Sequence, residues 1–179
     1  MRKIHIYYLV KDPIEASEVE KIAQNLKSNL HEVKVSFYDF GAAIDPPEGC
    51  ELITKDADEI GNFNMEITKS LISNISTDAL CVLQQGCVPR EGCLDRIDWG
   101  VFDNPDFSSI YCDYNVRHEG TTVRTYMKSP PVDEGAPLPM VFFSTRRLAE
   151  VSSGKDLFQQ AFNKYAGYHI PHSLCEVSQ

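Results

Sequence analysis

The sequence predicts a single α/β domain built on a mostly parallel sheet, and three observations support this prediction. Apolar, β-branched segments alternate with amphipathic helical segments through the first half of the chain. Residues 79–83 are apolar at every position, as expected of a central parallel strand that is covered on both faces. The chain has 179 residues and no long linker, so we expect one domain, with an α/β half at 1–103 and a second half at 104–179.

The elements of the first half follow from local patterns of apolar residues. β-branched and aromatic residues mark the expected strands, which lie at 3–10, 33–38, 51–54 and 79–83. Apolar residues at helical spacing mark three expected helices, which lie after the cap Asp12-Pro13, at about 64–74 and at about 92–102. The residues that these helices are expected to bury include Val19, Ile22, Ala23, Leu26 and Leu30 of the first and Leu94, Ile97 and Val101 of the third.

The second half is expected to contain a hairpin followed by short elements. Residues 108–115 and 121–128 flank the turn residues His118-Glu119-Gly120, and this pattern predicts a β-hairpin. A short strand at 140–143 and a short helix at 145–151 follow. A last amphipathic helix uses Leu157, Phe158 and neighbouring apolar residues, and the tail from His169 onwards is expected to return as a final strand.

Composition and charge exclude two broad classes of partner. The 17 Lys and Arg residues against 26 Asp and Glu give a net charge of −9, so a surface that coats nucleic acid is not expected. No segment approaches the roughly 20 apolar residues that cross a bilayer. The N-terminus is predicted to be the first strand and not a signal peptide. We therefore expect a soluble, cytoplasmic protein without a membrane span.

The six cysteines are expected to be reduced thiols and not disulfides or zinc ligands. No Cys-x-x-Cys pair occurs, and the equal spacing of Cys81, Cys87 and Cys93 does not match the paired ligands of a zinc site. Without a secretory signal, such cysteines usually behave as small buried hydrophobic residues.

Four segments stand in an order that carries a family resemblance. They are the strand end Asp39-Phe40-Gly41-Ala42 and the stretches STDALCVLQQGCVP, SSIYCDYNVRHEGTTV and GKDLFQQAFNKYAGYHIPHSLCEVS. In this order they resemble the family-2 glycosyltransferases, which have the GT-A fold of nucleotide-diphospho-sugar transferases. The resemblance implies a GT-A-like sheet with flanking helices and a C-terminal hairpin region. Its first half would bind a nucleotide-sugar donor, and its second half would face an unknown acceptor.

The resemblance also implies a donor site at three strand ends, the edge at which open α/β sheets bind ligands. The residues expected there are Leu9, Val10, Asp39, Gln84, Gln85 and Gly86. Asp39 either accepts hydrogen bonds from a base or ribose or forms a turn before Gly41. The two glutamines are candidates for hydrogen bonds to a sugar or ribose.

Gln84-Gln85-Gly86 stands where the family has two acids that hold a divalent cation against the diphosphate. Neutral amides are poor ligands for Mn²⁺ or Mg²⁺. The departure leaves four alternatives: no metal, a metal held by other residues, a loss of catalysis, or a polar turn that binds no ligand. The candidate replacement ligands are Asp113, His169 and His172. Asp113 is equally well explained as a strand residue paired with Arg117 or Arg124, and the histidines as residues without a metal.

The resemblance implies that Asp156 is the general base, because it matches the second acid of the family's catalytic pair. An inverting transfer needs such a carboxylate to take a proton from the acceptor hydroxyl. The family usually has an acid where this chain has Lys155, and Asp156 is alternatively a helix N-terminal cap. The candidates for neutralising the diphosphate are Lys128, Arg146 and Arg147, with surface charge as the alternative for the two arginines.

Three functions remain open at this point. The first is transfer of a sugar from a nucleotide-sugar donor. The second is a catalytically inactive GT-A-fold module that binds a nucleotide, a sugar or a protein. A flavodoxin-like redox role is the weakest, because the sequence has neither a Cys-x-x-Cys motif nor a glycine-rich phosphate loop. The hydrophobic hairpin makes a homodimer a candidate assembly.

Overall fold

The computed structural model of the chain describes residues 1–56, 76–118, 121–126, 139–151, 160–161 and 164–178. The helix expected at 64–74 and the candidate residues Lys128 and Asp156 lie outside these residues. Most of the amphipathic helix expected around Leu157 also lies outside them.

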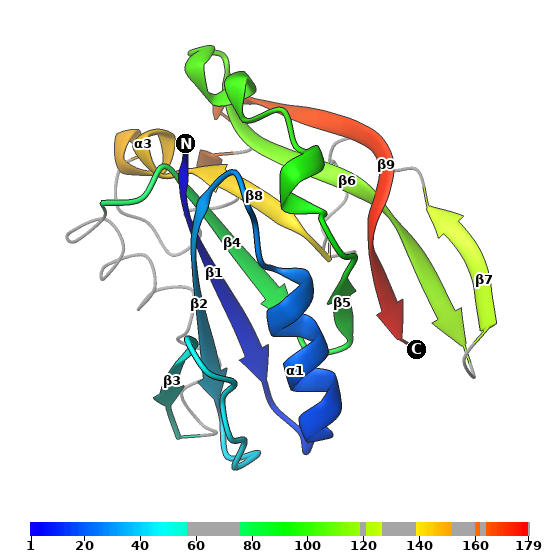
Figure 1. Cartoon of the computed structure of the whole chain (residues 1–179). Helices are drawn as coiled ribbons and strands as arrows, with labels where there is room; N and C mark the ends of the chain where they lie inside the picture. The colour runs from blue at the N-terminus through cyan, green and yellow to red at the C-terminus, as the bar shows by residue number, and fades with distance from the viewer. Residues whose placement is uncertain (57–75, 119–120, 127–138, 152–159, 162–163, 179) are drawn as a thin grey trace.

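The described strands form one twisted sheet (Figure 1). They are β1 (Lys3–Val10), β2 (Glu32–Asp39), β3 (Glu51–Thr54), β4 (Ala79–Gln84), β5 (Cys87–Pro89), β6 (Phe107–His118), β7 (Thr121–Tyr126), β8 (Val141–Ser144) and β9 (Ala166–Ser178). Their order is β3-β2-β1-β4-β8-β6-β9-β5, with β7 paired to β6. Within these strands only β5, β7 and β8 run against the common direction. The predicted α/β fold with a mostly parallel sheet is therefore confirmed.

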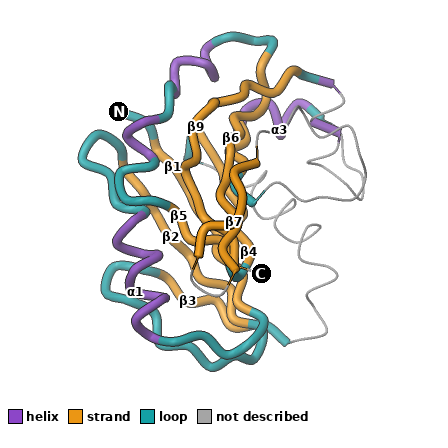
Figure 2. The backbone as a smooth tube through the Cα atoms, turned by 90° about the vertical axis from the view of Figure 1, so that its right-hand side faces the viewer, coloured by secondary structure: helices purple, strands orange, loops and turns teal. Residues whose placement is uncertain are grey.

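In the described part of the chain, two short helices cover opposite faces of the sheet, as Figure 2 shows. They are α1 (Ala16–Asn25) and α3 (Thr145–Glu150). Successive residues of a strand point to opposite faces, so Ile6 packs in the cluster that contains α1 while Tyr7 packs with Leu148 of α3. Burial on both faces explains why the central strands are apolar at nearly every position.

Several elements lie where the sequence predicts them. β1 and β3 have the predicted bounds, and the predicted hairpin forms from β6 and β7. The tail forms β9, which pairs in parallel with β6 along nearly its whole length. β8 and α3 match the short strand and helix expected after residue 139.

The first helix begins later and ends sooner than predicted. The Asp12-Pro13 pair lies outside α1, and the N-cap of α1 is Glu15. The helix begins later because the backbone of Lys11 and Asp12 is bound to the side chain of Gln85, which follows β4. Leu26 caps the helix and stays buried, whereas Leu30 lies beyond it and is 59% exposed.

The helix expected at 92–102 is replaced by two 3-10 turns, Leu94–Arg96 and Trp99–Asp103. The side chain of Asp98 accepts a hydrogen bond from the Gly100 backbone N–H (3.0 Å), and such local bonds compete with a continuous helix. Leu94 and Ile97 are still buried as expected, but Val101 is only half-buried.

Two predictions from composition can also be compared with the structure. All six cysteines are free, and five of them are buried, as expected of reduced thiols that pack as apolar residues. None of the helices in the described part of the chain is long and apolar enough to span a bilayer.

Candidate functional site

The carboxyl ends of three parallel strands meet at one edge of the sheet. Val10 of β1 pairs with Asp39 of β2, and Leu9 pairs with Gln84 of β4. The structure therefore brings these four predicted donor-site residues together. Leu9, Val10 and Asp39 are buried, whereas Gln84 is exposed at the edge.

β6 passes this edge at the height of Asp113. Phe142 of β8 pairs with both Cys81 of β4 and Ile110 of β6. Gln84 and Asp113 each lie three residues further along strands of the same direction. Asp113 therefore lies at a height on the sheet similar to that of Gln84, while β6 itself continues beyond it to His118.

Gln85 fastens the loop after β1 to the end of β4. Its side-chain oxygen Oε1 accepts hydrogen bonds from the backbone N–H groups of Lys11 (2.8 Å) and Asp12 (2.9 Å). Its Nε2 donates to the backbone oxygen of Asp12 (2.9 Å). The side-chain amide of Gln85 therefore holds the loop at Lys11 and Asp12 in place beside the end of β4.

Gly86 turns the chain from β4 into β5. Its φ of +88° lies in the left-handed region that favours glycine. Its carbonyl accepts a hydrogen bond from the backbone N–H of Ser178 (2.9 Å), so the end of β9 is fixed beside this turn.

Asp39 organises the loop that follows β2. Its carboxylate is 3% exposed and accepts hydrogen bonds from the backbone N–H groups of Gly41 (3.0 Å), Ala42 (2.6 Å) and Ile44 (3.2 Å). These bonds correspond to the turn-forming alternative. Contact between Asp39 and a base or ribose stays a prediction.

Asp113 and His169, two of the three predicted metal ligands, are in direct contact. The Nε2 atom of His169 lies 2.7 Å from Oδ1 of Asp113. Asp113 is buried, His169 is half-buried, and the imidazole stacks on the ring of Tyr111 with centroids 5.1 Å apart. A buried carboxylate and a partly exposed imidazole are therefore held against each other on neighbouring strands.

The third predicted ligand, His172, is separated from this pair by an irregularity in β9. Ile170 pairs with Cys112, but Ser173 pairs with the next residue, Asp113. Pro171 and His172 are therefore extra residues in β9, and both are exposed.

A second charged cluster on β6 and β9 was missed by the sequence reasoning. Arg117, which was a candidate partner of Asp113, instead places Nε 3.1 Å from Oε2 of Glu176. Arg90 reaches the other oxygen of Glu176 at 3.4 Å. The strand partner of β6 explains the difference, because β9 brings His169 and Glu176 beside β6. The ion pairs of Glu176 could have been predicted only from the parallel pairing of β6 with β9, which is not visible in the sequence.

Arg146 and Arg147 lie at the opposite edge of the sheet. They belong to α3, whose first residue, Thr145, donates a backbone hydrogen bond to Asp78 (3.2 Å), just before β4 begins. In Figure 1, α3 is at the top and the arrowheads of β1, β2 and β4 are at the bottom. The structure therefore does not bring these two arginines together with the other predicted donor-site residues.

Arg147 also forms an ion pair with Glu150 of the same helix. Its Nη1 donates to both carboxylate oxygens of Glu150 (2.8 Å each), and its guanidinium lies over the ring of Tyr165. The hydrogen bond from Tyr165 and the bond from Arg147 lower the pKa of the Glu150 carboxyl. Arg147 is thus part of the packing of α3.

No protein-family model matches the sequence, and neither does any curated protein. The fold nevertheless resembles solved glycosyltransferases. S. aureus TarS in complex with UDP-GlcNAc matches with a TM-score of 0.63 and 9% identity, over all of this chain and 59% of the TarS chain. The chain therefore spans less than two thirds of the length of that protein.

Two further enzymes give similar matches. A mannosyltransferase from Pyrobaculum calidifontis in complex with GDP-Man and Mn²⁺ has a TM-score of 0.57 at 11% identity, covering 97% of this chain and 56% of that one. Glucosyl-3-phosphoglycerate synthase from Mycobacterium tuberculosis, with Mn²⁺, UDP-glucose and phosphoglyceric acid, has a TM-score of 0.60 at 10% identity, covering 99% and 72%. The chain thus has the α/β fold of GT-A glycosyltransferases.

Proposed function

We propose that the chain binds a nucleotide-sugar donor at the carboxyl edge of β1, β2 and β4, beside Asp113 of β6, and transfers the sugar to an acceptor. The observation that carries this proposal is that Val10, Asp39 and Gln84 meet at that edge and that Asp113 lies at a similar height on β6. Open α/β sheets bind ligands at this edge. The fold-level likeness to enzymes solved with UDP-GlcNAc, GDP-Man and UDP-glucose supports the choice of donor class.

The departing diphosphate needs positive charge that Gln84 and Gln85 do not supply. Asp113 and His169 are the two side chains that would hold a divalent cation, which would neutralise the leaving group when bound. Within the described residues no three acidic, histidine or cysteine side chains are grouped as a metal site. A pair of protein ligands still fits, because Mg²⁺ usually keeps waters and phosphate oxygens as its other ligands. Imidazole is compatible with transition metals and carboxylate with Mn²⁺.

Asp156 is proposed as the general base, on the strength of the sequence resemblance alone. Replacing it with Asn should reduce donor-dependent transfer or hydrolysis by about 100-fold or more, because general-base catalysis typically contributes that much. Asp106→Asn is the matched control, since Asp106 is exposed. Equal losses in both variants would remove Asp156 from this role.

A binding module without turnover is the second candidate, and Gln85 is the observation that favours it. Its side-chain amide forms three hydrogen bonds to the loop after β1. At this position the chain therefore has a residue that stabilises a loop, where the family has a cation ligand. Such a module would bind the same nucleotide at the same edge but would not break the sugar–phosphate bond.

Thermal unfolding of the purified chain with UDP or GDP, with and without Mn²⁺, tests the proposal. A ligand at about 100 times its Kd stabilises a protein by about 2.7 kcal/mol. We expect Mn²⁺ to increase the stabilisation by nucleotide, and Asp113→Asn and His169→Gln to remove that increase. His172→Gln is the matched control and should keep it, because His172 lies outside the pair.

The outcomes separate the two candidate functions. Stabilisation together with donor hydrolysis supports the transferase, and stabilisation without turnover supports the binding module. No stabilisation by any nucleoside diphosphate, with or without Mn²⁺, would contradict both.

A further inference from the structure

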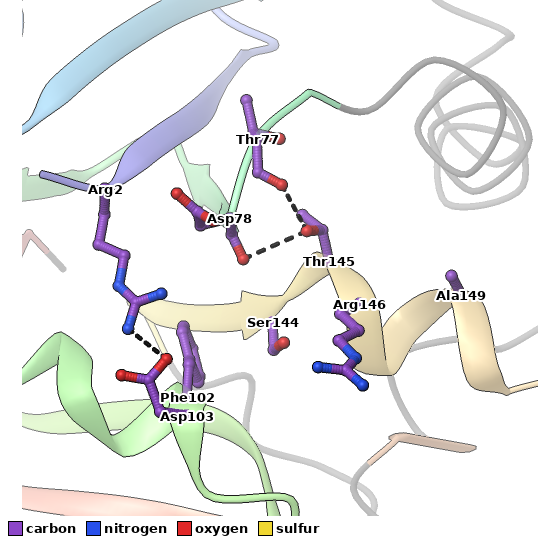
Figure 3. Close-up of a pocket in the computed structure, with 9 residues that line it drawn as sticks. All are labelled: Arg2, Thr77, Asp78, Phe102, Asp103, Ser144, Thr145, Arg146 and Ala149. Atoms are coloured by element: carbon purple, nitrogen blue, oxygen red, sulfur yellow. Dashed lines mark hydrogen bonds and ion pairs between the residues drawn. The ribbon is translucent and has the colours of Figure 1, made fainter.

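A second candidate site lies at the amino-terminal edge of the sheet, opposite to the proposed donor site. A pocket of about 390 Å³ opens there (Figure 3). Its lining residues are Arg2, Thr77, Asp78, Phe102, Asp103, Ser144, Thr145, Arg146 and Ala149. Its volume falls within the range of pockets that bind small molecules, which is roughly 300–1,000 Å³.

Hydrogen bonds to the sheet hold the walls of the pocket. The Thr145 hydroxyl donates to the backbone oxygens of Thr77 (2.5 Å) and Asp78 (3.2 Å). One carboxylate oxygen of Asp78 accepts from the backbone N–H of Lys3 (2.8 Å). The site is therefore preformed by the ends of β1, β4 and β8, which lowers the cost of ordering it around a ligand.

Two guanidinium groups approach the pocket from different sides of Ser144, as Figure 3 shows. Arg2 is oriented by bonds from Nη2 to Asp103 Oδ1 (2.6 Å) and to the backbone oxygen of Trp99 (3.3 Å). The side chain of Arg146 is 82% exposed, and among the described residues its Nε approaches the carboxylate of Glu150 at 3.7 Å. With respect to this part of the chain, most N–H groups of Arg146 are therefore available to a ligand.

The balance of donors and acceptors indicates the chemistry of that ligand. Arg2, Arg146 and Ser144 present more N–H and O–H groups than the bonds within the pocket use, while Asp78 and Asp103 each have an oxygen engaged. A planar guanidinium pairs well with carboxylate or phosphate oxygens. The ring of Phe102 offers an apolar wall for a carbon skeleton, and the two aspartates disfavour a ligand with many negative charges.

We propose that this pocket binds a small organic anion that carries one carboxylate or one phosphate group, with Arg146 as its main ligand. The site is separate from the nucleotide edge and does not depend on the proposed transferase activity.

Titration of the ¹⁵N-labelled chain with phenyl phosphate and with benzoate tests this proposal. At least one probe should shift the amide signals of residues around Arg2, Asp78 and Arg146. Arg146→Ala should weaken its binding at least about tenfold, because bonds to charged groups contribute roughly 1.5–3 kcal/mol. Arg96→Ala, which removes an exposed arginine outside the pocket, should leave the affinity unchanged.

The two probes also distinguish the ligand classes. Tighter binding of phenyl phosphate assigns the site to phosphate esters, and tighter binding of benzoate assigns it to carboxylates. Arg146→Lys, which keeps the charge but loses the planar fork, should fall between the wild type and Arg146→Ala. Shifts confined to other parts of the chain, equal affinity in Arg146→Ala and Arg96→Ala, or no binding of either probe at 10 mM (roughly the weak limit of a specific small-ligand site) would overturn the proposal.

Discussion

The two halves of the sheet both place polar groups towards the carboxyl ends of the parallel strands but use them differently. On β1, β2 and β4, Asp39 and Gln85 bind backbone groups of neighbouring loops. On β6 and β9, Asp113 contacts His169, and Glu176 forms partly exposed ion pairs with Arg117 and with Arg90, which follows β5. At the ends of β1, β2 and β4, where the donor site is predicted, polar side chains therefore stabilise the edge, and the ion pairs lie on the neighbouring strands.

The buried centre of the first half shows the same use of polar groups. His5 Nδ1 lies 3.0 Å from the Tyr7 hydroxyl, and its Nε2 lies 2.8 Å from the Ser36 hydroxyl. Ser36 in turn donates to Glu51 (2.7 Å). Burial, with a smaller contribution from Lys34, lowers the pKa of His5 to about 4. His5 is therefore neutral in the native state near pH 7.

The largest expected effect is the loss of stability on protonation of His5. Above pH 6.5 the imidazole is neutral in both the folded and the unfolded chain. Below it the unfolded chain binds a proton that the folded chain does not bind until about pH 4. The free energy of unfolding should fall by up to about 3 kcal/mol across this window. Urea unfolding at a series of pH values measures it.

His5→Gln should remove most of the pH dependence between pH 6.5 and about 5, while His172→Gln should keep it. Below that range the Glu51 carboxyl adds a second loss, because its bonds to Ser36 and Lys34 lower its pKa. An unchanged pH profile in His5→Gln would show that the network of the first half does not control acid stability.

A smaller effect is expected from the amide that fastens the loop after β1. Gln85→Ala removes three hydrogen bonds and should lower the free energy of unfolding by roughly 1–2 kcal/mol, because water replaces part of what is lost. Gln84→Ala changes an exposed neighbour and should cost less than about 0.5 kcal/mol. Equal effects in chemical denaturation would contradict the structural role given to Gln85.

Local pattern predicted the strands well because their signals are contiguous in the sequence. β1 and β3 have their predicted bounds since each is a short run bounded by polar or turn residues. The predicted start of α1 was wrong because Gln85, far away in the sequence, binds Lys11 and Asp12. A contact between residues so far apart cannot be predicted from the local sequence pattern.

The candidate site was predicted in part for the same reason. Strand ends identified Val10, Asp39 and Gln84, and parallel pairing brings them together. The contact between Asp113 and His169 depends on the register of β6 with β9, and the location of Arg146 depends on the antiparallel direction of β8. Register and strand direction are set by tertiary packing, so they became visible only in the structure.

The most direct test of the account is to find where a nucleotide and its cation bind. Paramagnetic Mn²⁺, added in small amounts with UDP to the ¹⁵N-labelled chain, broadens the amide signals of nearby residues. The account predicts broadening around Asp113 and His169 and in the loop at Lys11 and Asp12. Broadening centred instead on Arg2 and Arg146, or none that requires UDP, would contradict it.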